Sequence, residues 1–261
     1  MATIAEDGAT GTIRTRSDTR FFFVMAAVIS AIIVAGFAMN LAMGRSTFAV
    51  PIAYHVHAFV FFGWVALYLA QAWTIHSGQI ALHRSLGRLA YIWVPAMVAM
   101  GFVIMIVSLR RGGGPFFFDQ NEFLVSNSLG LVLFGALVMT ALRRQRHTGW
   151  HRRLILVAMS ILSGPGLGRL LPMPLLMPNA WRIMMVVTLI FPVIGMIADK
   201  RRLGRVHPAY LVGVGALIAV QVLAEVIAYS PAGIAFTQWV LAGSAGAARP
   251  MAAFLPPGVE L

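Results

Sequence analysis

Long runs of apolar residues, separated by short polar connections, occupy most of the chain. Each run is close to the roughly 20 residues that an α-helix needs to cross the hydrocarbon core of a bilayer. The pattern therefore predicts an all-α fold, an integral membrane bundle of seven transmembrane helices. The predicted spans are Phe21–Met39, Ile52–Ile75, Leu89–Leu109, Phe123–Leu142, Leu154–Leu171, Trp181–Ala198 and Tyr210–Tyr229.

The spans divide the chain into three regions. Residues 1–19 contain Gly, Thr, Ser and charges of both signs, which predicts a flexible cytoplasmic tail. Residues 20–230 form the predicted seven-helix membrane domain. Residues 231–261 form an outer tail, in which we expect an interfacial helix around Phe236–Leu241.

The composition makes a lipid bilayer the expected partner of the chain. Hydrophobic residues make up 59% and charged residues 11%, whereas about 25% of a soluble domain is charged. So few charges cannot solvate the exterior of a soluble fold. The chain contains no cysteine, which excludes disulfides, thiolate metal sites, iron–sulfur clusters and a cysteine nucleophile.

The positions of the basic residues indicate the orientation of the bundle. The net charge of +12 would suggest nucleic acid in a soluble protein, but here the basic residues cluster in short connections between spans. Fourteen of the 20 fall in the N-terminal tail and in every second connection after it. Positive charge is retained in the cytoplasm, so this alternation places the N-terminus inside and excludes nucleic acid as a partner. A cleaved signal peptide is the alternative for the first span, whose roughly 19 residues exceed a typical signal core.

The second–third and fourth–fifth connections resemble each other. Both contain His, Ser or Thr, and Gly, in His76–Gly78 and His147–Gly149. Both then contain an apolar residue, His-Arg, one variable residue and Leu, in Leu82–Leu86 and Trp150–Leu154. The similarity predicts a duplicated helical hairpin, whose copies are related by an axis along the membrane normal.

These motifs also carry a resemblance to known proteins. His57 at the head of a span, Leu82–Gly87, Trp150–Arg153 and Gly204–Tyr210 resemble an uncharacterised family of bacterial multi-pass membrane proteins, over residues from about 50 to 240. That resemblance implies a bacterial inner (cytoplasmic) membrane and brings no reaction with it. The chain is also distantly similar to diheme cytochrome b-type helical bundles, which implies haem b as a cofactor.

The repeated His-Arg pairs are the candidate haem site. His83 and His151 begin the third and fifth spans at equivalent places, so their rings could face each other if those helices are neighbours. Haem b needs one or two axial imidazoles and cations near its acidic propionates. The alternative is that His and Arg at a helix start anchor the span among lipid headgroups. The predicted haem-binding residues are His83, His151, Arg84, Arg152 and Arg153, with His76 and His147 in reserve.

A second group of polar residues lies at one depth in the outer leaflet. Ionisable residues inside spans usually face a bundle interior or a wet cavity. Arg169 and Glu225 are expected to pair, and Ser163–Gly168 around Pro165 is expected to interrupt the fifth span. A buried ion pair beside a simple proline kink is the alternative. The predicted ligand pocket for a small anionic or carbonyl compound consists of His57, Asn127, Arg169, Gln221 and Glu225.

Three functions fit these patterns. The leading hypothesis is a membrane redox protein that handles haem or quinone. The second is a non-enzymatic ligand-binding, sensing or transport protein that uses the outer pocket, and the third is an accessory membrane subunit. No metal site is predicted, because His55 and His57 lie about 200° apart on a helix, and no catalytic residue can be named.

Overall fold

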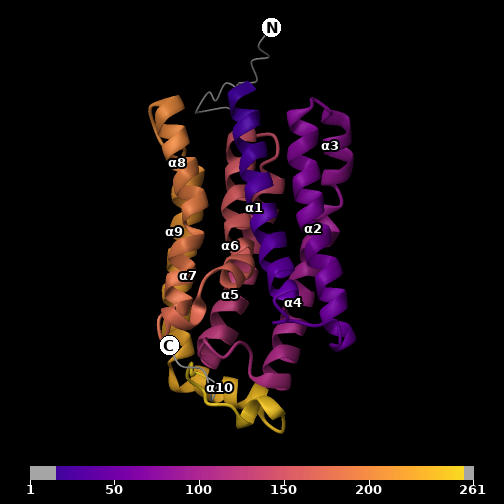
Figure 1. The fold of residues 1–261 in the computed structure, drawn as a ribbon. Helices are drawn as coiled ribbons and strands as arrows, with labels where there is room; N and C mark the ends of the chain where they lie inside the picture. The colour runs from indigo at the N-terminus through magenta and orange to yellow at the C-terminus, as the bar shows by residue number, and fades with distance from the viewer. Residues whose placement is uncertain (1–15, 256–261) are drawn as a thin grey trace.

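The computed structural model describes residues 16–255, and it is helical with no strand in that range. Seven helical segments are long and apolar enough to cross a membrane, which confirms the all-α seven-helix bundle (Figure 1). The spans are α1 (Arg16–Ala42), α2 (Ile52–His76), α4 (Ala90–Gly112), α5 (Gln120–Arg143), α6 (Thr148–Leu170), α7 with α8 (Ala180–Thr188 and Ile190–Leu203) and α9 (Pro208–Ala228).

Several helices extend past the apolar runs into polar sequence. α1 begins at Arg16, so residues 16–19 of the predicted tail are helical, and residues 1–15 lie outside the described range. A short helix that was not predicted, α3 (Ile80–Gly87), carries the first His-Arg pair. Beyond the spans lie α10 (Pro231–Leu241), where a helix was expected, and the 3₁₀ turns η1 (Met173–Leu176) and η2 (Ala245–Ala248).

α6 is the central helix of the bundle. Half of the most apolar 18-residue stretch of α6 is buried, whereas the corresponding share is 22–39% in the other spans. The helix packs on α1, α5, α7, α8 and α9. Its segment from Leu156 to Ser160 is almost completely inaccessible. A feature placed on α6 is therefore held by the whole bundle.

The predicted interruption of the fifth span is wrong, because α6 runs unbroken through Pro165 to Leu170. Gly166, directly after the proline, serves close packing instead. A Cβ added to Gly166 would lie 2.7 Å from the Cα of Ile33 in α1, and one added to Gly36 would meet the carbonyl oxygen of Gly166. Pro165 removes a single helical hydrogen bond near the end of α6, which the contact with α1 tolerates.

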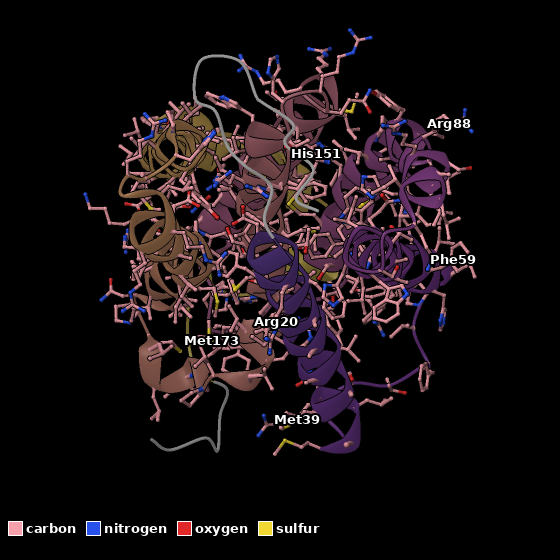
Figure 2. The ribbon with its side chains drawn as sticks, turned by 90° about the horizontal axis from the view of Figure 1, so that it is seen from above. Arg20, Met39, Phe59, Arg88, His151 and Met173 are labelled. Carbon is pink, nitrogen blue, oxygen red and sulfur yellow. The ribbon has the colours of Figure 1, made fainter. Side chains whose placement is uncertain are left out.

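The outer surface of the bundle is apolar. Phe59 is 74% exposed, Ile92 78% and Val226 67%, and Phe59 points away from the bundle at its edge (Figure 2). Exposed apolar area on this scale requires an apolar solvent. The surface is therefore in contact with the lipid bilayer.

Substitution of Gly36 by Ala tests the α1–α6 contact. The new Cβ meets backbone atoms that cannot move without separating the helices, so we expect a loss of about 1–3 kcal/mol of stability. The measurement is thermal unfolding in mild detergent. Gly215→Ala in α9 is the matched control, because open space surrounds that position. Equal melting of both variants would contradict the close approach.

Candidate functional site

One end of the bundle, called here the basic end, is tied together by ion pairs. It is the end at which α1 begins, and α3 and the end of α8 lie there too (Figure 1). The Arg153 side chain is completely buried and forms a bidentate pair with Asp199, through Nε–Oδ2 and Nη2–Oδ1 distances of 2.7 and 2.6 Å. Asp199 also accepts a hydrogen bond from the backbone N–H of His207. The pair therefore joins α6 and α8 to the start of α9.

Asp18 of α1 holds two more arginines at this end. Its two carboxylate oxygens lie 3.2 Å from Arg152 and 3.2 Å from Arg202. Sequence analysis assigned Arg152 and Arg153 to haem propionates and named no acidic partner for either. The structure removes Arg153 from that set because Asp199 occupies its guanidinium on two sides. Asp18 and Asp199, each isolated among basic residues in the sequence, were the available signal.

The rings of His83 and His151 lie together at the basic end. His83 lies on the short helix α3 and does not begin the third span as predicted, because α3 precedes α4. The rings of His83 and His151 are perpendicular, and their centroids are 6.5 Å apart. His83 Nδ1 lies 3.2 Å from the carbonyl oxygen of Gln71 in α2, and His151 Nδ1 lies 2.8 Å from that of Ala141 in α5. A carbonyl only accepts, so each Nδ1 carries the proton.

Two buried donors, on residues bonded or adjacent to these histidines, have no hydrogen-bond partner among the described residues. They are Nε2 of Gln71, whose carbonyl holds His83, and Nε of Arg152, the residue after His151. Arg84 is exposed beside His83 on α3. The reserve histidines differ, because His76 stacks on Phe23 of α1 with 4.9 Å between the rings, and His147 is the residue that precedes the first turn of α6.

Part of the predicted outer pocket forms one group at the opposite end. The Arg169 guanidinium lies 3.9 Å from the ring centre of Phe37 in α1 and donates to the carbonyl of Pro165 in its own helix. The Arg169 charge interacts electrostatically with His57. The ring centroid of His57 lies 4.3 Å from that of Phe61. This half of the predicted set therefore lies between α1, α2 and α6.

The other half forms a separate group, and the predicted pair between Arg169 and Glu225 is wrong. Glu225 accepts instead from Arg182 of α7 at 3.0 Å. Gln221, one turn earlier on α9, accepts from the Trp181 indole at 3.3 Å. Charge alone cannot decide between two arginines near one acid, whereas the fold brings α7 beside α9. Asn127 of α5 donates to the carbonyl of Phe123 in its own helix.

Sequence reasoning missed the most buried acid at this end. Glu122 in the first turn of α5 is 2% exposed, and its Oε1 has no hydrogen-bond partner in the structure. Arg182, Glu225 and Asp119 all act on it electrostatically. Two of these carboxylates, Glu122 and Glu225, also act on Arg182. The signal was present as Asp119 and Glu122 at the start of a span, but a helix N-terminus is also where acids are common.

A cavity of about 140 Å³ lies beneath α10 at the same end. Gln120, 1% exposed, leaves Oε1 without a partner there, and Nε of Arg249 is also unpartnered. Burial lowers the pKa of Arg249, which the nearby Asp119 carboxylate opposes. None of the five predicted pocket residues lines this cavity. Its walls are Gln120, Gln238, Leu241, Ala247, Arg249 and Met251.

No family model, curated protein or solved structure matches the chain. Across residues 16–255, no group of three or more His, Asp or Glu side chains is placed to hold a metal ion. What the site can bind therefore follows from its own side chains. The His83–His151 pair is the predicted pair of cofactor ligands, and the fold brings it together.

Asp199→Asn tests the buried pair at the basic end. The substitution leaves the Arg153 charge buried and unpaired, so we expect a loss of about 3–5 kcal/mol in the free energy of unfolding. Arg202→Gln is the control, because that pair is partly exposed and should contribute no more than about 1 kcal/mol. Unfolding in detergent by heat or denaturant measures both.

The double variant Arg153→Met with Asp199→Leu separates the pair from its surroundings. It removes both charges at once, so it should be more stable than Asp199→Asn alone. If Asp199→Asn unfolds like Arg202→Gln, the buried pair does not hold the basic end together.

Proposed function

We propose that this integral membrane protein binds haem b between α3 and α6, with His83 and His151 as its axial ligands. The observation that carries the proposal is the matched setting of the two rings. Each donates from Nδ1 to a backbone carbonyl of the preceding span, and the rings lie 6.5 Å apart. A histidine that only fixes its own helical hairpin needs no second histidine beside it. Here the two rings lie together.

The residues present fit the cofactor in ligand chemistry. A hydrogen bond from Nδ1 fixes the tautomer and orientation of a ligating histidine and leaves Nε2 for the metal. Metal–imidazole bonds are about 2.0–2.1 Å long, so two rings that would hold one metal must lie close together. The ring centroids of His83 and His151, 6.5 Å apart, meet that requirement.

The surroundings supply partners for the acidic edge of the cofactor. Nε of Arg152 and Nε2 of Gln71 are buried donors without acceptors, and a propionate carboxylate would provide them. Arg84, exposed beside His83, adds a third donor at the rim. Arg153 takes no part, because its role is to hold α6 against α8.

Bound haem b supplies one-electron transfer, and the chain itself holds and tunes the group. The two imidazoles would set its potential, and the arginines at the rim would stabilise its carboxylates. The proposed role is a redox step that passes electrons to or from a quinone in the bilayer. The basic end faces the cytoplasm, and the membrane is the inner membrane of a bacterium.

Binding of a small ligand at the opposite end is a second candidate function. It is favoured by the cavity beneath α10, where Gln120 Oε1 lacks a donor and Arg249 Nε lacks an acceptor. A small anionic or carbonyl compound that also carries a hydroxyl would satisfy both atoms. This function and haem binding use different residues, so they are not exclusive.

An absorption spectrum tests the haem proposal. Protein expressed with sufficient haem supply and purified in mild detergent should show a Soret band that shifts on reduction by dithionite. The Soret band should disappear or shift in His83→Ala and in His151→Ala, because each substitution removes one of the two proposed iron ligands. His55→Ala is the matched control, since His55 is exposed on α2 at the other end.

Two results would overturn the proposal. The first is a colourless wild-type protein that takes up no added haem. The second is a Soret band that survives both histidine substitutions unchanged. Thermal unfolding of each variant shows that it is folded when its spectrum is recorded.

A further inference from the structure

A groove of about 270 Å³ opens on the outside of the bundle between α5, α6 and α9, close to the basic end. Thr140 and Arg144 are exposed along it, and Leu137 and Leu154 are buried behind it. It faces the bilayer, because Val212 on its α9 side is 55% exposed. Its walls are Ala136, Leu137, Thr140, Arg144, Trp150, Leu154 and Val212.

The length of the groove matches one membrane leaflet. Ala136, Thr140 and Arg144 follow one another at intervals of four residues, so they lie along one face of α5 and its C-terminal cap. Eight residues of helix extend about 12 Å. Half of a hydrocarbon core is roughly 15 Å. The small side chains of Ala136 and Thr140 line this face of the groove ahead of Arg144.

The groove ends in Arg144, which forms no ion pair with any carboxylate of residues 16–255. The Arg144 guanidinium lies 4.5 Å from the ring centre of Trp150. Arg152 and Arg153 in the next helix are both paired with aspartates. The connection from Arg143 to His147 contains no acid at all.

We infer that this groove binds an anionic phospholipid, with one acyl chain against α5 and the phosphate on Arg144. Trp150 would hold the guanidinium flat at the depth of the headgroups, where indole rings preferentially lie. Arginine is suited to this contact because its planar fork matches a phosphate. Basic pockets at the ends of transmembrane helices recognise anionic headgroups in this way. The site is independent of the histidine pair.

Native mass spectrometry with two lipids tests the inference. Delipidated protein is titrated with dioleoyl phosphatidylglycerol or dioleoyl phosphatidylcholine, and the first bound lipid is quantified. The wild type should prefer phosphatidylglycerol. Arg144→Gln should weaken that first binding step about fivefold, the effect expected from one basic residue near a headgroup.

Arg146→Gln is the matched control. It removes the same charge from the same connection, but Arg146 does not line the groove. Ala136→Trp is the second variant, because it fills the groove and leaves every arginine in place. It should reduce the first bound equivalent of both lipids. Inorganic phosphate added at millimolar concentration should not displace the lipid, which separates a lipid site from a simple anion site.

Three outcomes would overturn the inference. One is equal binding of the two lipids by the wild type. Another is an equal loss in Arg144→Gln and Arg146→Gln, which would mean general surface charge. The third is unchanged binding in Ala136→Trp, which would place the lipid elsewhere. Ala136→Trp keeps the test valid if Arg144→Gln does not fold.

Discussion

The cost of placing an ionised side chain in hydrocarbon decides where the charged residues of this chain can lie. Most basic residues of the described chain fall at helix ends, where water or headgroups solvate them. Arg153 is buried inside the bundle and donates two hydrogen bonds to the carboxylate of Asp199. Glu225 likewise meets Arg182. The helices are therefore positioned by charge pairs at both ends and by close packing, such as that of Gly36 on Gly166, between them.

The spans could be predicted from the sequence because the ability to cross a bilayer depends on the length and hydropathy of one continuous segment. The pairings could not, since they depend on which helices become neighbours. Asp199 lies 46 residues from Arg153 in the chain, and several basic residues lie closer to it. For the same reason, the sequence predicted Arg169 as the partner of Glu225, whereas the fold places Arg182 there. The prediction at Pro165 failed because its flanking glycines were taken as helix breakers, whereas Gly166 lets α1 approach closely.

The histidine pair was found because the two connections share one short motif, which can be recognised without any alignment. Two copies of one motif predict two equivalent places, and the fold brought His83 and His151 within 6.5 Å. Their shared hydrogen bonds to the carbonyls of Gln71 and Ala141 could not be anticipated, because those carbonyls belong to the preceding helices. The proposed haem site and the proposed lipid groove both use this end, where unpaired donors and unneutralised arginines remain after the aspartates are taken.

The arrangement of charge across the membrane is the claim most open to direct measurement. The chain has no cysteine, so single cysteines placed at Gln145, between α5 and α6, and at Ser244, after α10, are unique labels. A membrane-impermeant maleimide added to intact cells should label Ser244→Cys, and should label Gln145→Cys only after the membrane is permeabilised. Labelling of Gln145→Cys in intact cells, or of both positions from the same side, would contradict the account.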